Sequence, residues 1–344
     1  MRPFKISAAV GRLAVAAVAM SIGMAAVPAE AETRFTITVD TGPNHIRNIT
    51  LRVFMERLTE ATGGELVGEL FESAQLYAAR DEARAVARGD VQMSVTTNSA
   101  LSAFASDLNA LDMPLFVGLT PEQLSRIIDG PFGQMLADRV ANQLGVVVPG
   151  RWFLLGYADT FGAGRDFGSF EDYQGARVRI FGGAAFISRL AALGAEGLAI
   201  PFPDVPLALS QGTIDGLLTT SETVRSGQLY ESGVKSAFTD NAAVLFYIPV
   251  VNKAFLDGLS EAHRAAFLEA WDSVIDEQRS EALRRQAEAR IHNEANGIVY
   301  TDPTPEELAA ANEKLQAIVP SLISELNVDP AVIELARQQA AAAN

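Results

Sequence analysis

The chain has 344 residues, no cysteine, and 27 Lys and Arg against 42 Asp and Glu, which gives a formal net charge of −15. A chain this acidic is not expected to bind nucleic acid or an anionic membrane surface through its overall charge. Without cysteine it has neither a disulfide framework nor a lipobox-type anchor. An anionic ligand would therefore need a local basic site.

Residues 1–31 have the pattern of a signal peptide. The basic stretch MRPFKISAAVGR precedes the apolar run LAVAAVAMSIGMAAV, and an A-x-A cleavage site ends at Ala31. The apolar run is shorter than the ~20 residues of a membrane-spanning helix, and no second run follows. We therefore expect an exported protein of the Gram-negative periplasm that begins at Glu32 and is not inserted in the membrane.

The first part of the mature chain predicts a parallel α/β unit. Residues 35–39 alternate as a half-exposed strand does, and an amphipathic helix follows and ends at Gly63-Gly64. TPEQ at 120–123 has the Thr, Pro and Gln of a helix start, and a helix ends at Gly145. Further strands are expected at 65–71, 91–95 and 146–148, with a short helix at 80–90. This order implies right-handed parallel crossovers.

The same alternation begins again near Leu155. Its expected elements are strands at 176–180, 198–200 and 213–218 and helices at 184–194 and 204–212. A second lobe agrees with the length, because the 313 residues after the signal peptide exceed the ~250–300 at which one core stops growing. The expected division is residues 32–154 and about 245–285 in lobe I, and residues 155–244 and about 286–344 in lobe II.

Two segments are expected to join the lobes. Residues 243–251, AVLFYIPVV, are almost continuously apolar, as in a strand buried on both faces, and would carry the chain back to lobe I. No helix breaker occurs between Ser260 and Gly297, so a single long helix is expected to lie across both lobes. Two shorter helices finish the chain. The expected fold class is α/β with two lobes and crossing strands.

The residues that most enzymes need are poorly represented. The chain has three histidines and no G-x-S-x-G, H-E-x-x-H or Walker sequence. His45 with Asp40 is the only nearby candidate for an acid/base pair. We therefore expect no catalytic residue and no metal site, and keep a periplasmic enzyme acting on an organic acid as the alternative.

The stretch GARVRIFGG, residues 175–183, places two arginines in an acidic chain. In a strand Arg177 and Arg179 point to one face, and the pair is either a charged strand edge or a site for an anion. An arginine can hold a carboxylate with two parallel hydrogen bonds. Polar loops beyond the strand ends favour a ligand cleft, and they are residues 39–45, 95–100, 155–161, 179–183, 200–204 and 217–222.

The run GARVRIFGGAAFISRLAALGAEGLAIPFPDVPLALSQGTIDGLLTT, residues 175–220, closely resembles the central segment of solute-binding proteins of tripartite ATP-independent periplasmic (TRAP) transporters. Further matches are ESAQL (72–76), RGDVQMSV (88–95) and LDMPLF (111–116). The resemblance implies a two-lobed periplasmic binding protein (Venus-flytrap) that closes on a small organic anion and delivers it to a TRAP membrane permease, with no cofactor in most members. We expect this protein to be a monomer without a cofactor. A protein that presents the ligand to a sensor or chemoreceptor is a further alternative.

The resemblance also implies site residues. Arg179 falls on the family arginine that grips the substrate carboxylate, Arg177 replaces a lysine, and Phe202 matches a ring beside the ligand. Thr219 stands where many members have an asparagine. Additional candidate substrate contacts are Asp40, Thr97, Asn98 and Tyr157. The loop at 155–161 lacks an arginine that many members carry, which puts the family's dicarboxylate and sialic-acid specificities in doubt for this chain.

Overall fold

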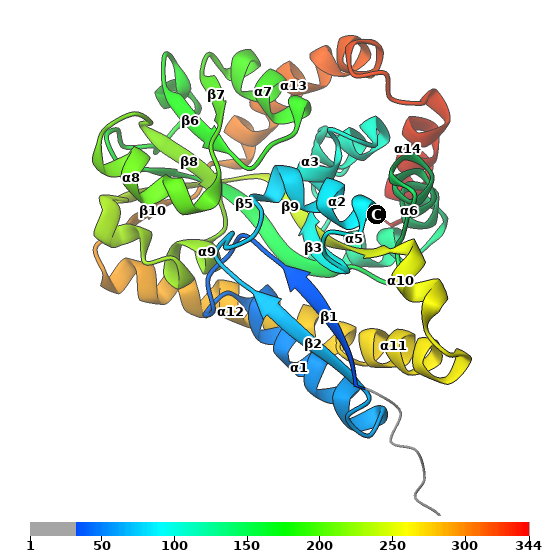
Figure 1. Ribbon diagram of the computed structural model, residues 1–344. Coiled ribbons are helices and arrows are strands. Elements are labelled where there is room, and N and C mark those ends of the chain that lie inside the picture. The colour runs from blue at the N-terminus through cyan, green and yellow to red at the C-terminus, as the bar shows by residue number, and fades with distance from the viewer. Residues whose placement is uncertain (1–31, 344) are drawn as a thin grey trace, which may run out of the picture. The chain divides into compact units, whose positions relative to one another are not determined.

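A mixed β-sheet runs through residues 32–343, the part of the chain that the computed structural model describes (Figure 1). The predicted signal peptide, residues 1–31, lies outside the described residues. The strand order is β2-β1-β3-β9-β5-β8-β6-β7, and β4 and β10 also pair with β9. The strands are β1 (Thr33–Thr38), β2 (Leu66–Phe71), β3 (Met93–Thr97), β4 (Val146–Val147), β5 (Phe153–Gly162), β6 (Arg177–Ile180), β7 (Glu196–Ala199), β8 (Gly216–Thr219), β9 (Ser236–Asn252) and β10 (Val299–Thr301).

Helices cover the sheet and fill the connections between its strands. The α-helices are α1 (Ile46–Ala61), α2 (Ala79–Arg88), α3 (Asn98–Leu101), α4 (Asn109–Asp112), α5 (Pro121–Ile128), α6 (Pro131–Leu144), α7 (Ala184–Leu193), α8 (Val205–Ser210), α9 (Ser221–Ser226), α10 (Lys253–Gly258), α11 (Glu261–Ser273), α12 (Ile275–Ala295), α13 (Pro305–Glu325) and α14 (Pro330–Ala343). Four short 3-10 helices are η1 (Ser106–Leu108), η2 (Phe170–Tyr173), η3 (Phe202–Asp204) and η4 (Leu229–Ser232).

The first segment forms the parallel unit that the sequence predicts. β1 pairs in parallel with β2 on one side and with β3 on the other. Phe35 and Ile37 are buried with Phe54 of α1, so the alternating pattern of β1 supplies one wall of the core. The Thr120 and Gln123 side chains form the predicted capping box at the start of α5.

The second segment repeats this arrangement. β6 lies between β7 and β8 and is parallel to both, with Val178 and Ile180 fully buried as their positions predict. Gly194 ends α7 in the left-handed conformation, with φ 91°. Since β6 and β8 run in the same direction, their carboxyl ends lie at one edge of the sheet, where ligands of α/β proteins collect.

The long strands β5 and β9 are antiparallel and connect the two parallel units. β9 begins at Ser236, earlier than the expected residue 243, and pairs with β3, β4, β5 and β10. The register between β5 and β9 shifts after Leu154 and again after Ala158. Asn241, opposite the second shift, has φ 45°. These irregularities bend the strands where they pass from one unit to the other.

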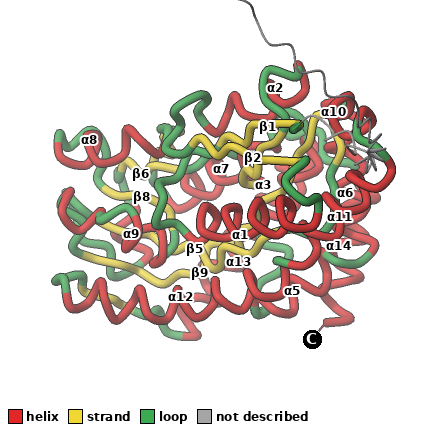
Figure 2. Tube along the Cα trace, turned by 60° about the horizontal axis from the view of Figure 1, so that its bottom comes forward, coloured by secondary structure: helices red, strands yellow, loops and turns green. Residues whose placement is uncertain are grey.

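The expected single helix from Ser260 to Gly297 is wrong in one detail. α11 and α12 are separate helices that meet at Val274, whose φ and ψ are −94° and −11°. Arg57 of α1 donates a 2.8 Å hydrogen bond to the Ser273 carbonyl, and a side chain inserted in this way breaks the helical ladder. α12 packs against α1, β5 and α9 and so contacts both parallel units (Figures 1 and 2).

The last two helices cover different units. α13 lies against α7, whereas α14 lies against α5 and α6 (Figure 1). The expected lobe division placed residues 286–344 together in lobe II, and α14 packs on helices of the segment assigned to lobe I. The lobe boundaries stay a prediction. Across residues 32–343, every helix is too short or too polar to cross a membrane.

A fully buried carboxyl group makes the stability of this fold sensitive to pH. Glu82 of α2 accepts a 2.7 Å hydrogen bond from the Ser94 hydroxyl on β3. Burial, assisted by the charge of Asp40, raises the pKa of Glu82 from 4.5 to about 8. Between these values the native protein keeps a proton that the unfolded chain has lost. The free energy of unfolding therefore falls as the pH rises through this window, by about 1.4 kcal/mol per pH unit from this group.

We expect Glu82→Gln to remove the part of the pH-dependent loss of stability that comes from Glu82, because an amide does not titrate. Urea unfolding at pH 5, 6.5 and 8 should show a shallower decline for the variant than for the wild type. Glu56→Gln, on the exposed side of α1, is the matched control and should leave the decline unchanged. Equal slopes for Glu82→Gln and the wild type would contradict the assignment.

Candidate functional site

Two adjoining cavities, of about 30 and 120 Å³, lie beyond the carboxyl ends of strands from both parallel units. Asp40, Ala79, Arg179, Phe181 and Phe202 line both, and we call the pair the Arg179 cavity. The smaller part is also lined by Thr41, Thr97, Leu155, Thr219, Thr223 and Tyr247. Five of the seven candidate contacts from the sequence thus come together here: Asp40, Thr97, Arg179, Phe202 and Thr219.

Arg179, near the end of β6, is the buried cation of this cavity. It is 3% exposed, and its Nε donates a 2.9 Å hydrogen bond to the Ile200 carbonyl. Its Cζ lies 5.4 Å from the Phe181 ring centroid and 5.9 Å from that of Phe202. Within the described residues neither terminal NH₂ group has a hydrogen-bond partner. Burial lowers the pKa of Arg179 to about 10, so the side chain is still charged at neutral pH.

Arg177, two residues earlier, is already occupied. Its guanidinium donates to both carboxylate oxygens of Asp215, at 3.2 and 2.7 Å, and to the Gly212 carbonyl at 2.8 Å. These contacts hold the pKa of Asp215 below its ordinary value. The Arg177 side chain is 41% exposed. These contacts tie β6 to the turn before β8 and leave Arg179 as the arginine available to a ligand.

Asp40, which follows β1, has a partner that sequence reasoning missed. Arg47 of α1 is fully buried, and its Nη2 donates a 2.5 Å hydrogen bond to Asp40 Oδ1. The same guanidinium donates to the Val95 carbonyl at 2.8 Å and lies 4.3 Å from the Tyr247 ring centroid. In the sequence Arg47 is an ordinary charged residue of a predicted helix, and no local pattern indicates that its side chain is buried.

Hydroxyl groups form most of the remaining polar lining. The Thr97 Oγ accepts a 3.2 Å hydrogen bond from the Ala100 amide and thereby caps α3. Thr219, at the end of β8, is 1% exposed, and its hydroxyl has no hydrogen-bond partner within residues 32–343. Tyr247 and Thr223 were not predicted. Tyr247 was hidden in the apolar run at 243–251, where its register opposite Thr97 could not be read without the strand pairing.

Asn98 does not line the Arg179 cavity. It is fully buried, its Nδ2 donates a 2.7 Å hydrogen bond to Asp112 Oδ1, and its Oδ1 accepts a 3.3 Å hydrogen bond from the Phe246 amide. Burial raises the pKa of Asp112 to about 7. These contacts join α3, α4 and β9, which gives Asn98 a structural position beneath the site.

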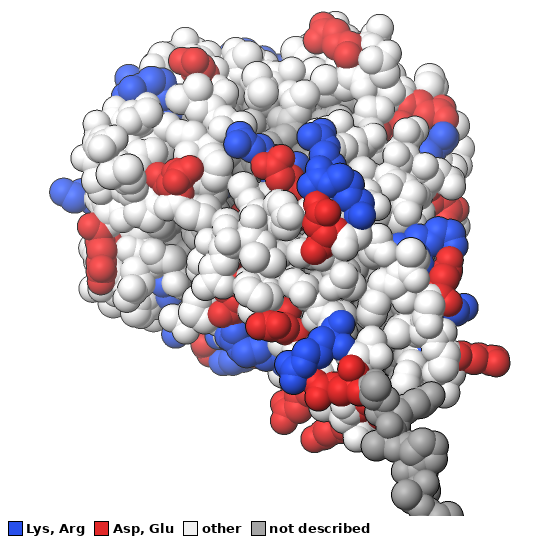
Figure 3. Space-filling view, viewed as in Figure 1, with Lys and Arg blue, Asp and Glu red and all other residues white. Residues whose placement is uncertain are grey.

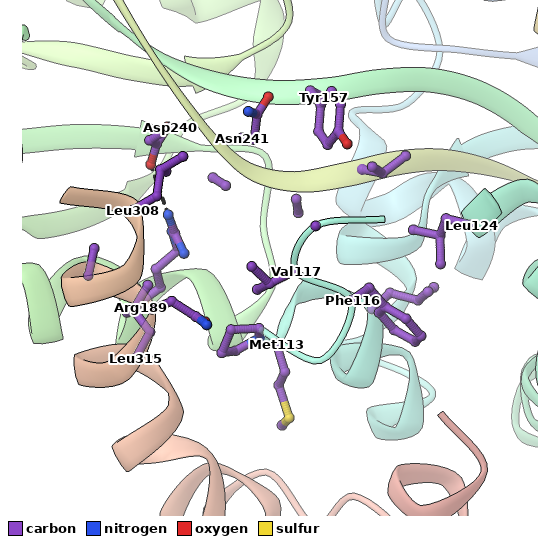
Figure 4. A pocket seen from close by; sticks show the side chains of 18 of the residues that line it. Met113, Phe116, Val117, Leu124, Tyr157, Arg189, Asp240, Asn241, Leu308 and Leu315 are labelled. Atoms are coloured by element: carbon purple, nitrogen blue, oxygen red, sulfur yellow. Dashed lines mark hydrogen bonds and ion pairs between the residues drawn. The ribbon is translucent and has the colours of Figure 1, made fainter. Parts of the chain in front are cut away.

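Tyr157 does not reach the Arg179 cavity either. Its hydroxyl donates a 2.6 Å hydrogen bond to the Leu119 carbonyl, and its ring lines a separate cavity of about 200 Å³ (Figure 4). The register shift between Leu154 and Gly156 is the cause, because the extra residue makes Leu155 face the Arg179 cavity and turns Tyr157 to the other face of β5. Residues 155–161, expected from the sequence to be a loop lining the cleft, are part of β5 instead.

His45 and Asp40 do not form the acid/base pair of the enzyme hypothesis. His45 is 1% exposed, its Nδ1 accepts a 3.2 Å hydrogen bond from the Arg47 amide, and its Nε2 lies 3.3 Å from Glu222 Oε2. Burial lowers the pKa of His45 well below its ordinary value. Glu222 of α9 also accepts from the Ile46 amide at 3.1 Å. His45 thus caps α1 and binds α9.

The described residues offer little for other ligand classes. Within residues 32–343 no group of three or more His, Asp and Glu side chains could hold a metal ion. The face seen in Figure 3 mixes acidic and basic side chains, without the continuous basic surface that nucleic-acid binding requires.

Comparison with known proteins identifies relatives along most of the chain. The C4-dicarboxylate-binding periplasmic protein DctP of Rhodobacter capsulatus is 26% identical over 309 residues, which are 88% of this chain and 90% of that protein. The sialic acid-binding periplasmic protein SiaP of Vibrio cholerae is 22% identical over 291 residues, 85% of this chain and 89% of that protein.

Solved structures with the same fold include the sugar acid binding protein DctPAm from Advenella mimigardefordensis in complex with galactonate. It superposes with a TM-score of 0.86 at 17% identity and covers 91% of this chain and 99% of its own. A TRAP periplasmic solute-binding protein from Shewanella oneidensis with bound succinate gives a TM-score of 0.83 at 22% identity, over 90% of this chain and all of its own. The expected two-lobed α/β fold is confirmed. Since the model of the family described as bacterial extracellular solute-binding protein, family 7 (DctP), matches residues 38–325, this chain belongs to that family.

Proposed function

We propose that this protein binds a small organic acid in the Arg179 cavity, in the periplasm, as a monomer, and delivers it to a TRAP membrane permease. The buried Arg179 guanidinium is the observation that carries the proposal. Its two unpartnered NH₂ groups face a space lined by Phe181 and Phe202, where a carboxylate would gain two parallel hydrogen bonds. The ligands named for the relatives above, which are organic acids, support the same class.

The proposed ligand contacts are Arg179, Asp40, Thr97, Phe202 and Thr219. They come from both parallel units, which the bent strands β5 and β9 connect. A cleft built in this way closes by hinge bending when a ligand bridges its two sides. Asn98 and Tyr157 stay sequence predictions that the lining of the cavity does not support.

Ligand-induced closure is the test of this function. A thermal-shift screen of organic acids comes first, because a ligand at 100 times its dissociation constant stabilises the protein by about 2.7 kcal/mol. Small-angle scattering with a ligand from the screen should then show a smaller radius of gyration, and the uncharged D-sorbitol should not. An unchanged curve at saturating acid would contradict a closing cleft.

Two alternatives give different results with the same protein. A periplasmic enzyme would convert the acid, whereas a binding protein returns it unchanged after long incubation. His45 and Asp40 are bound to other residues, Glu222 and Arg47, and this weighs against the enzyme. A ligand presenter for a sensor would bind the acid but would not support uptake by permease-containing vesicles, which a transport protein would.

A further inference from the structure

The Arg179 cavity carries both signs of charge. Asp40 lines both of its parts together with Arg179. Its Oδ1 is bound to Arg47, but among residues 32–343 its Oδ2 has no hydrogen-bond partner. The Asp40 charge acts on Arg179 strongly enough to offset part of the burial effect on the pKa of that arginine. A ligand held by Arg179 therefore lies next to an acceptor oxygen that carries negative charge.

Arg47 does not provide a second anion site. Its guanidinium is fully buried and donates to Asp40, Thr41 and the Val95 carbonyl. It does not line either part of the cavity. Arg47 therefore holds Asp40 through Oδ1 and leaves one cation, Arg179, for a carboxylate in the interior.

A second carboxylate finds only a weak partner at the mouth. Arg80 lines the larger part of the cavity, but its side chain is 74% exposed and lies 3.4 Å from Asp81 on the same helix. Water and salt screen such a charge. In the interior Asp40 Oδ2 and the Thr219 hydroxyl have no hydrogen-bond partner within residues 32–343, and both can accept a hydrogen bond from a ligand hydroxyl.

We propose that Asp40 makes this site selective for hydroxylated monocarboxylates and disfavours dicarboxylates. The inference rests on the proposed function and specifies its ligand class. The carboxylate of the ligand binds Arg179, and hydroxyl groups near it donate to Asp40 and Thr219. A second carboxylate of the same ligand would approach the Asp40 carboxylate, lose its water, and gain there only a neutral hydroxyl donor such as Thr219, without a cation to balance its charge.

Two carbon-matched series of acids test the selectivity by titration calorimetry. The six-carbon series is D-gluconate, D-glucarate and hexanoate, and the four-carbon series is D-erythronate, tartrate and butanoate. In at least one series the hydroxylated monocarboxylate should bind about ten-fold or more tightly than both the dicarboxylate and the alkanoate. A dicarboxylate that binds within about three-fold of its matched monocarboxylate, or more tightly, overturns the proposal.

Variants assign the selectivity to Asp40. Asp40→Asn should reduce the preference for the monocarboxylate over the dicarboxylate by about ten-fold or more, whereas Asp40→Glu should keep the preference. Asp204→Asn is the matched control, because Asp204 is exposed and outside the cavity lining. The readout is a ratio of two affinities within one variant, so a lower stability of Asp40→Asn does not imitate the effect. An unchanged ratio in Asp40→Asn overturns the proposal.

Failure of the proposed function gives a different result. If the thermal-shift screen and both series yield no binding acid, the organic-acid function itself is contradicted, and the selectivity proposal falls with it. If a dicarboxylate binds best and compacts the protein in solution, the function stands and only the role of Asp40 is wrong.

Discussion

Replacing Arg179 by Lys should weaken ligand binding by a factor of about 30 to several thousand, which corresponds to about 2–5 kcal/mol. The guanidinium is buried, it is fixed by its hydrogen bond to the Ile200 carbonyl, and two of its groups are free for a carboxylate. A lysine keeps the charge but cannot make two parallel hydrogen bonds or hold the Ile200 carbonyl at the same time. Titration calorimetry with the tightest acid from the screen measures the loss.

Arg177→Lys is the matched control, because it makes the same change two residues away. Arg177 is directed to Asp215 and the Gly212 carbonyl, and its side chain is 41% exposed, whereas Arg179 is buried. Its replacement should leave the affinity within about three-fold of the wild type. If Arg177→Lys proves more damaging than Arg179→Lys, or if Arg179→Lys binds nearly as well as the wild type, the carboxylate site has been assigned to the wrong arginine.

The two arginines show which features of the site could be predicted from the sequence. Alternation in β6 placed Val178 and Ile180 in the core correctly, and the resemblance singled out Arg179. The hydrogen-bond partner of the Arg177 side chain could not be predicted from the sequence. Its partner Asp215 lies far along the chain, at the turn before β8, and becomes a neighbour only because β6 and β8 are paired.

The errors have physical causes of the same kind. The helix expected from Ser260 to Gly297 is interrupted at Val274, because Arg57 of another helix takes the Ser273 carbonyl. Tyr157 was placed in the cleft because residues 155–161 were expected to be a loop lining it, whereas they belong to β5, and a register shift turns Tyr157 to the other face. In both cases the deciding interaction joins segments that are distant in the sequence. Local sequence patterns therefore do not reveal the break at Val274 or the bulge in β5.

Replacing Arg47 by Met should lower the free energy of unfolding by about 3–5 kcal/mol, the usual loss when one member of a buried ion pair is removed. Arg47 is fully buried and satisfies Asp40, Thr41 and the Val95 carbonyl at once. Met has a similar length and stays apolar, so the loss reflects the unpaired Asp40 carboxylate and the vacated acceptors more than a change in packing. Urea unfolding at pH 7 measures it.

Arg52→Met, on the same helix, provides the comparison. Arg52 pairs with Glu72 at the surface with 43% of its side chain exposed, and such pairs contribute well below ~1 kcal/mol. The double variant Arg47→Met/Asp40→Asn should recover part of the loss, since it removes the charge that Arg47→Met leaves unpaired. Equal stability of Arg47→Met and Arg52→Met would mean that the buried pair does not hold the loop after β1 in place. In that case the Asp40 position, and with it the polarity of the ligand cavity, would have to be maintained by the hydrogen bonds between Thr41 of that loop and Asn48 of α1.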